Sequence, residues 1–226
     1  MLEKILEVER GAFLFLNGCH HLFWDSFMWL YSGQIAWIPL VLFFLILLFY
    51  KNDWKEALLI VCSIAIVIAL CDQFTSGICK PYFMRFRPTH HPDFMDYVKT
   101  VNDYRGGKYG FISSHAANAF GFAMFSLLLF RYRWFSIFIL LWATIMAYSR
   151  IYLGVHFISD IVPGIFVGIF FGYLVYTLYV AIRRKLLKKT EKPCRIYPVS
   201  RKKMILYGLF FTILCMLVYS IFNLYI

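Results

Sequence analysis

Long runs without a charged residue constrain the fold of this chain more than any other feature of its sequence. Six such runs occur, at 26–50, 57–71, 111–130, 134–149, 161–182 and 204–226, and polar residues extend the second as far as Lys80. A helix that crosses a bilayer needs about 20 mostly apolar residues. We therefore predict an all-α fold, a polytopic membrane helix bundle with about six transmembrane helices, of which the second and fourth are the shortest.

The composition supports a membrane environment for a single domain over residues 1–226. The chain is 62% hydrophobic and only 15% charged, whereas soluble domains are about half apolar and about a quarter charged. Residues 1–25 have no basic region leading into an apolar core, so they do not form a signal peptide. Leu2, Ile5, Leu6 and Phe13 instead predict an amphipathic helix that lies in the membrane interface.

Basic residues predict the topology. The 23 Lys and Arg outnumber the 12 Asp and Glu, and ten of the 23 lie within residues 183–203. Cytoplasmic loops of membrane proteins carry an excess of such residues. We therefore predict a basic cytoplasmic linker at 183–203, an extra C-terminal span at 204–226 and an outer loop at 89–110. This placement indicates contact with membrane lipids and no nucleic-acid partner.

Unusual polar residues gather at the predicted outer ends of the spans, in three groups. The first is the stretch KPYFMRFRP at 80–88, which contains Lys80, Arg85 and Arg87. A belt of basic and aromatic residues at the headgroups would by itself explain Lys80 and Arg85. It does not require Arg87.

The second group is FISSHAANAF at 111–120, where Ser113, Ser114 and His115 precede a long apolar run. A serine at a helix start is an ordinary N-cap, and this interpretation suits Ser113. A helix N-terminus is also a favourable site for an anion. His115 in the first turn would face such an anion.

The third group is SRIYLGVHFISD at 149–160. His156 and Asp160 are four residues apart, so we predict that they share one face at the start of the fifth span. The carboxylate can hold one imidazole nitrogen and leave the other nucleophilic. Arg150 lies six residues before His156. Three ionisable residues at a junction between spans indicate a functional site.

Together these groups supply cations, free helix-start amides and two histidines. Arginine side chains match phosphate oxygens in pairs. The sequence therefore predicts a phosphate ligand at the membrane surface, attacked by one histidine while the other donates a proton.

The three groups resemble the signature of the type 2 phosphatidic acid phosphatase superfamily, which is K-x6-R-P, then P-S-G-H, then S-R-x5-H-x3-D. The matching residues are Lys80, Arg87, Pro88, Ser113, His115, Ser149, Arg150, His156 and Asp160. The resemblance covers about residues 20–180. It departs from the family at Ile112, which replaces proline, and at Ser114, which replaces glycine.

The resemblance implies a membrane-embedded lipid phosphatase that forms a phosphohistidine. His156 would be the nucleophile, Asp160 would orient it, and His115 would protonate the leaving oxygen. Five residues would bind the phosphate: Lys80, Arg87, Arg150, Ser113 and Ser114. The family implies no metal and no cofactor, and a lipid phosphate as the partner.

Several functional alternatives stay open at this point. Family members act on undecaprenyl pyrophosphate, phosphatidylglycerol phosphate, phosphatidic acid or lipid A phosphates. The phosphoryl group could also pass to a lipid acceptor, which would make the protein a phosphotransferase, or the scaffold could bind or transport lipid without catalysis. Asp72 and the pair His90–His91 have no assigned role. We expect a bacterial inner membrane location with the site facing the periplasm or exterior.

Overall fold

The computed structural model describes residues 2–225, with side chains from residue 6 onward. Over this range the regular secondary structure is helical, with one isolated β-bridge between Phe86 and Tyr109, and loops join the helices. The α-helices are α1 (Leu2–Gly18), α2 (Leu22–Ser32), α3 (Ile38–Phe49), α4 (Trp54–Asp72), α5 (Lys80–Phe83), α6 (Ser114–Phe130), α7 (Arg133–Tyr152), α8 (Ile158–Leu186) and α9 (Val199–Phe222). A π-helix, η2 (Gln73–Cys79), joins α4 to α5, and four short 3-10 helices occur at Ile35–Trp37, Pro88–His90, Met95–Tyr97 and Pro193–Arg195.

The predicted membrane helix bundle is confirmed. Among the described residues, four helical stretches are long and apolar enough to cross a membrane: Trp54–Phe83, Arg133–Tyr152, Ile158–Leu186 and Val199–Phe222. The run predicted as one span at 26–50 forms two helical pieces bent by 71°, which together add a fifth candidate. The 17-residue helix α6 is apolar but falls just below the length of these candidates.

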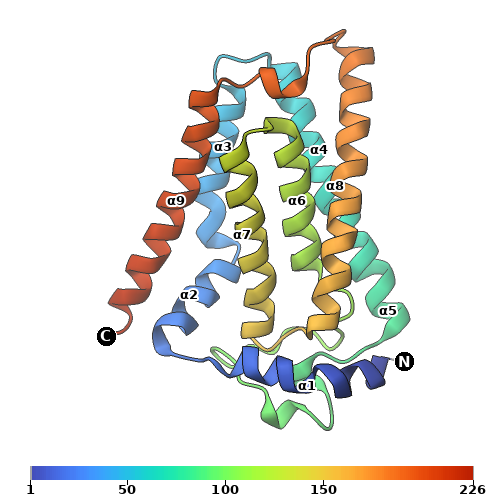
Figure 1. Ribbon diagram of the computed structural model, residues 1–226, viewed down its shortest axis with the longest axis vertical. Coiled ribbons are helices and arrows are strands. Elements are labelled where there is room, and N and C mark those ends of the chain that lie inside the picture. The colour runs from blue at the N-terminus through green and yellow to red at the C-terminus, as the bar shows by residue number, and fades with distance from the viewer. Residues whose placement is uncertain (1, 226) are drawn as a thin grey trace.

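Helix α6 lies at the centre of the bundle and packs against α4, α7 and α8 (Figure 1). The contact with α8 is close because three glycines of that helix, spaced four residues apart, face α6: Gly164, Gly168 and Gly172. A Cβ atom added to Gly168 would lie 2.3 Å from the carbonyl oxygen of Ala117, and one on Gly172 would lie 2.5 Å from that of Gly121. Small residues of this kind allow helix backbones to approach in a membrane. The packing brings the N-termini of α6 and α8 together at one end of the bundle.

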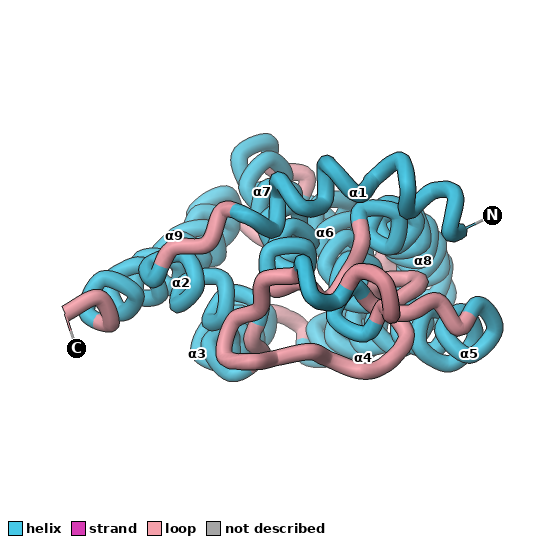
Figure 2. Tube along the Cα trace, turned by 90° about the horizontal axis from the view of Figure 1, so that it is seen from below, coloured by secondary structure: helices cyan, strands magenta, loops and turns pink. Residues whose placement is uncertain are grey.

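The two ends of the bundle differ in character. The basic segment 183–203 and the turns after α3 and α6 lie at one end, at the top of Figure 1. Helix α1 and the loops that carry the three polar groups lie at the other end, which Figure 2 views directly. The charge-based topology requires this separation. That the basic end faces the cytoplasm stays a prediction.

Helix α1 lies across the end of the bundle (Figure 2). It was predicted to belong to an interfacial segment over residues 1–25, but it ends at Gly18. Residues 22–25 belong to α2, because His21 caps that helix by accepting a hydrogen bond from the backbone of Phe23.

The apolar stripe of α1 faces the protein. Leu6 and Phe13 are buried in the core, whereas Val8 and Phe15 are exposed. The predictions on the side chains of Leu2 and Ile5 lie outside the described part of the chain. If α1 meets the membrane interface, it does so through the exposed Val8 side.

Candidate active site

The C-terminal end of the second span carries Lys80 and two hydroxyls. In the π-helix the backbone N–H of Lys80 bonds to the carbonyl of Thr75, five residues earlier. The wider turn places Thr75, Ser76 and Lys80 near the hydroxyl of Ser114, which lies 2.8 Å from Lys80 Nζ, 2.9 Å from Thr75 Oγ1 and 2.8 Å from Ser76 Oγ. π-Helical turns occur often at functional sites. Asp72 contacts Lys80 only through Ser76, whose hydroxyl donates to the Asp72 carboxylate at 3.2 Å.

The start of α6 supplies a cap and a histidine. The Ser113 hydroxyl accepts a hydrogen bond from the Ala116 N–H at 3.5 Å, so it caps the helix. Its backbone N–H donates to the Asp160 carbonyl at 3.0 Å, which ties α6 to α8. His115 follows in the first turn, half-buried. Three cations lie close enough to act on its ring: Arg150, Arg87 and Lys80.

A short pairing of two loops places Arg87. The backbone N–H of Arg87 donates to the Lys108 carbonyl at 3.1 Å, and that of Gly110 donates to the Arg85 carbonyl at 2.9 Å. The Arg87 guanidinium then donates to the carbonyls of Tyr109 and Val155 at 3.1 and 3.2 Å. Gly110 permits a close backbone approach, because a Cβ there would lie 3.0 Å from the Asp160 carboxylate.

His156 and Asp160 form a buried pair, with Nδ1 3.4 Å from Oδ2. The prediction that both lie on the fifth span was wrong for His156, because α8 begins at Ile158. Asp160 is the third residue of the helix, and its carboxylate accepts the Phe157 N–H at 3.0 Å. An acidic residue is favourable in a first helical turn. This cap, and not a shared helix face, brings the carboxylate back to the histidine.

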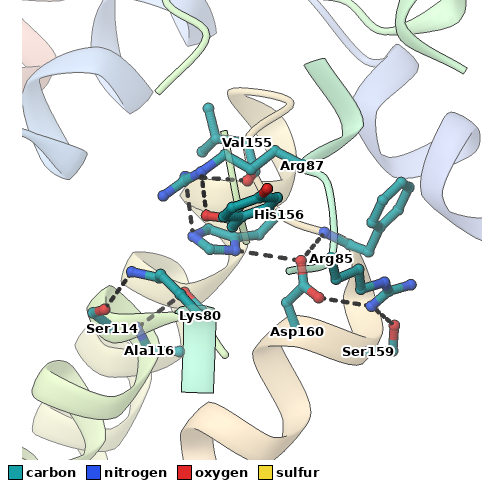
Figure 3. A network of polar contacts seen from close by, with 12 residues as sticks. Lys80, Arg85, Arg87, Ser114, Ala116, Val155, His156, Ser159 and Asp160 are labelled. Carbon is teal, nitrogen blue, oxygen red and sulfur yellow. Dashed lines mark hydrogen bonds and ion pairs between the residues drawn. The ribbon is translucent and has the colours of Figure 1, made fainter. Parts of the chain in front are cut away.

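The histidine ring is oriented by its two neighbours. Nδ1 faces Asp160, while Nε2 lies 3.3 Å from Arg87 Nη1 (Figure 3). A proton on Nδ1 satisfies the carboxylate and leaves the Nε2 lone pair directed at the cations. Burial, and then the charges of Arg87, Arg150 and Lys80, hold the pKa of His156 well below its ordinary value. The ring is therefore neutral at neutral pH, and a neutral imidazole can act as a nucleophile.

Arg150 lies on the last turn of α7 and is 3% exposed. One guanidinium nitrogen donates to the Ser32 hydroxyl, and the ring of Tyr104 lies 6.0 Å from the guanidinium carbon. Its Nε is buried and has no hydrogen-bond partner in the structure. Among the side chains that the structure describes, from residue 6 onward, no carboxylate forms a salt bridge with Arg150, Lys80 or Arg87. Uncompensated cations of this kind favour an anionic ligand.

The structure adds two residues that the sequence analysis did not place in the site. Arg85, assigned to a headgroup belt, is 5% exposed and donates to Asp160 Oδ1 at 2.6 Å. It also donates to Glu9 of α1 at 2.8 Å. The sequence does contain a sign of this contact, since Glu9 lies three residues after Leu6 and four before Phe13, on the buried stripe of the helix. A carboxylate on such a stripe needs a partner.

The remaining candidates do not assemble a second centre. No group of three or more His, Cys, Asp or Glu that could hold a metal ion occurs in the part of the chain that the structure describes. His90 and His91 lie in the loop near the site. The Nδ1 of His90 lies 3.2 Å from the Thr89 hydroxyl, and the His91 ring packs against Phe157, with centroids 6.5 Å apart.

Comparison with known proteins identifies relatives. The PAP2 superfamily matches residues 56–184, which contain all three motifs. The chain is 46% identical over 220 residues to a lipid A 4'-phosphatase of Porphyromonas gingivalis, covering 95% of this chain and 93% of that protein. It is 37% identical to a lipid A 4'-phosphatase of Bacteroides thetaiotaomicron over 98% of this chain and 99% of that protein. A PAP2-type phosphatidylglycerolphosphate phosphatase from Bacillus subtilis has a similar fold, with a TM-score of 0.60 at 18% identity over 80% of this chain and 89% of that chain.

Proposed function

Because the chain belongs to the PAP2 superfamily and is an integral membrane lipid phosphatase, we propose that it removes the 4'-phosphate of lipid A. Two lipid A 4'-phosphatases align with it over nearly their whole lengths, which supports this substrate above the other lipid phosphates of the family. The observation that carries the mechanism is the His156–Asp160 pair, in which Nδ1 faces the carboxylate and Nε2 faces Arg87.

In the first step the Nε2 lone pair of His156 attacks phosphorus, and the bond from phosphorus to the lipid oxygen breaks. The negative charge of the bound phosphate favours the protonated form of His115. His115 gives its proton to that oxygen, so the lipid leaves as an alcohol. The Nδ1 proton of His156 stays on the ring, and Asp160 stabilises the positive charge that develops there. The product of this step is a phosphohistidine.

In the second step a water molecule attacks phosphorus and the bond to Nε2 breaks. His115, now neutral, accepts the proton of the water. Inorganic phosphate leaves, and both histidines return to their starting states. Neither step requires a redox reagent, and the only co-substrate is water.

The transferred phosphoryl group would be held by Lys80, Arg87 and Arg150. Their positive charges stabilise the extra negative charge of the five-coordinate transition state. Backbone N–H groups in the first turn of α6, from Ser114 onward, would add the favourable end of a helix dipole, while Ser113 caps that turn. The Lys80 amine would bind a phosphoryl oxygen, either in place of the Ser114 hydroxyl or together with it.

We place the reaction at the outer face of a bacterial inner membrane. The basic segment 183–203 lies at the end of the bundle opposite the site, and basic segments favour the cytoplasm. A site on the other side would face the periplasm.

Release of phosphate from purified lipids in detergent tests this function. Lipid A with its 4'-phosphate should give a higher kcat/KM than phosphatidic acid, phosphatidylglycerol phosphate or undecaprenyl pyrophosphate, and a chelator should leave the rate unchanged. His156→Ala should release no phosphate. A preference for another lipid would refute the substrate assignment. Loss of activity with a chelator, reversed by a divalent ion, would refute the mechanism.

A further inference from the structure

Helix α1 contributes a buried carboxylate to the reaction centre. Glu9 is 9% exposed. Its Oε1 accepts a hydrogen bond from Arg85 Nη2 at 2.8 Å, and its Oε2 accepts the backbone N–H of Ser159 at 2.8 Å. The Ser159 hydroxyl donates to Glu9 as well. One side chain of α1 therefore binds both the loop after α5 and the first turn of α8.

Arg85 connects this carboxylate to the histidine pair. Its Nη1 donates to Asp160 Oδ1 at 2.6 Å and to the Ser159 hydroxyl at 2.6 Å. Its guanidinium carbon lies 4.8 Å from the centre of the Phe157 ring. Figure 3 shows Asp160 between His156 and Arg85. The guanidinium is thus held between two carboxylates, with Nη2 on Glu9 and Nη1 on Asp160.

The two carboxylate oxygens of Asp160 have different partners in this arrangement. Oδ1 accepts a hydrogen bond from Arg85, whereas Oδ2 contacts His156 Nδ1 and accepts a hydrogen bond from the Phe157 N–H. If Arg85 moved, the carboxylate could turn about its last bond and weaken the contact with Nδ1. Glu9 limits that motion because it fixes the far end of the guanidinium. Buried polar groups of this kind are held firmly only when every member of the network is satisfied.

We propose that Glu9 and Arg85 are positioning residues that hold Asp160 against His156, so that the seating of α1 on the bundle sets the geometry of the nucleophile. This inference rests on the proposed function, in which His156 attacks the phosphate. Neither residue contacts Nε2, so neither is a catalytic residue. Loss of either should lower kcat more than it changes KM, because the phosphate-binding cations stay in place.

The charges of the two residues give a second and sharper consequence. The His156–Asp160 pair is faced by Lys80, Arg87, Arg150, Arg85 and His115. Removing the negative charge of Glu9 makes the surroundings of the His156–Asp160 pair more positive, so a proton binds to the pair less readily. Removing the positive charge of Arg85 has the opposite effect. A role in folding alone would not move the pH dependence in opposite directions.

The experiment compares Glu9→Gln and Arg85→Gln with Glu7→Gln, which changes an exposed carboxylate on the same helix. Initial rates on one lipid phosphate are measured from pH 4 to 8 in detergent, so that ionisation of the substrate is common to all variants. Glu9→Gln should lower kcat about 10- to 100-fold, the usual effect of losing a hydrogen bond to a charged group. In the pH profile of kcat/KM, the acidic limb of Glu9→Gln should lie at lower pH than the acidic limb of the wild type. The acidic limb of Arg85→Gln should lie at higher pH than the acidic limb of the wild type. Glu7→Gln should match the wild type in both.

Wild-type kcat and an unmoved acidic limb in Glu9→Gln would overturn the inference, whatever the change in melting temperature. If Arg85→Gln does not fold, Arg85→Lys replaces it. Lysine keeps the charge and loses the two-ended fork, so it should lower kcat and leave the acidic limb near that of the wild type. Turnover by His156→Ala would overturn the proposed mechanism itself. An inactive His156→Ala together with a fully active Glu9→Gln would overturn the positioning role alone.

Discussion

The amine of Lys80 lies 2.8 Å from the hydroxyl of Ser114, although the two residues belong to different helices and are 34 positions apart. Ser114 stands where the resembled family has glycine, so this contact is a feature that a glycine could not supply. The same hydroxyl lies 2.9 Å from Thr75 Oγ1. It therefore holds the lysine near the start of α6, where the phosphate would bind.

Ser114→Ala should raise KM by up to about tenfold while kcat changes less, because Lys80 keeps its charge and its contact with Ser76 but loses one of two partners. Ser114→Gly should behave in the same way. Steady-state kinetics on a lipid phosphate measure the effect. The matched control is Ser126→Ala on the same helix, since the Ser126 hydroxyl is buried without a partner. Equal KM values in Ser114→Ala and the wild type would show that the contact does not assist substrate binding.

Arg150→Lys should lower kcat/KM by at least about 100-fold, even though it preserves the charge. The planar fork of arginine can bind two phosphoryl oxygens while its other nitrogen stays on Ser32, and lysine offers only a point charge. Arg131→Lys, at an exposed position, is the control. If Arg150→Lys retained full activity and Arg150→Ala did not, Arg150 would act through charge alone.

The apolar runs and the three motifs predicted the helical bundle and the groups of polar residues at one of its ends. They did so because charge is excluded from lipid and because each motif lies where a span ends. The bend between α2 and α3 was not predictable from a run of 25 uncharged residues, since hydropathy carries no information on a break in direction. The position of His156 before α8 was missed for a related reason. A spacing of four residues fits a helix face, but here a first-turn cap gives the same proximity.

The partners of Arg85 were missed because they come from a distant segment. Sequence spacing relates Arg85 to Arg87, whereas one of the two carboxylates that hold it, Glu9, belongs to α1, 76 positions away. Only the packing of α1 on the end of the bundle brings the two together. The buried stripe of α1 contained the necessary information in Glu9, but not the identity of its partner.

His156 should make the wild type lose stability in acid. Its pKa is held well below the ordinary value by burial and by neighbouring cations, so the unfolded state binds a proton near pH 6.5 while the folded state does not. The contribution of neutral His156 to the free energy of unfolding is therefore fully present above about pH 6.5. As the pH is lowered further, this contribution decreases by about 1.4 kcal/mol per pH unit until the folded-state pKa is reached. Melting temperatures in detergent from pH 7.5 to 5 should show a smaller decline in His156→Gln. Parallel declines in the two proteins would contradict the lowered pKa.

Native cysteines provide a test of the topology. Cys19 lies just after α1 at the site end, and Cys194 lies within the basic segment 183–203 at the other end. In single-cysteine variants of intact cells, an impermeant maleimide should label Cys19 from outside and Cys194 only after lysis. The outer membrane must first be made permeable to the reagent. The reverse pattern would place the site in the cytoplasm.

The roles of the two histidines can be separated by the choice of leaving group. His156 is proposed as the nucleophile, so His156→Ala should abolish turnover of every substrate. His115 is proposed as the general acid, and its help matters only when the leaving oxygen needs a proton. Such assistance is typically worth about 10²- to 10⁴-fold. An alkoxide leaves poorly without a proton, whereas p-nitrophenolate leaves readily.

His115→Ala should therefore lose far more activity on a lipid phosphate than on p-nitrophenyl phosphate. With the good leaving group the phosphohistidine should also accumulate, because His115 no longer accepts a proton from the incoming water. Rapid quenching in base, in which a phosphohistidine is stable, followed by counting of protein-bound phosphate would detect it, with His156→Ala as the blank. Equal losses on the two substrates, without accumulation, would mean that His115 binds the phosphate and that another group supplies the proton. Lys80 would then be the first alternative, since its amine lies at the start of α6 beside Ser114.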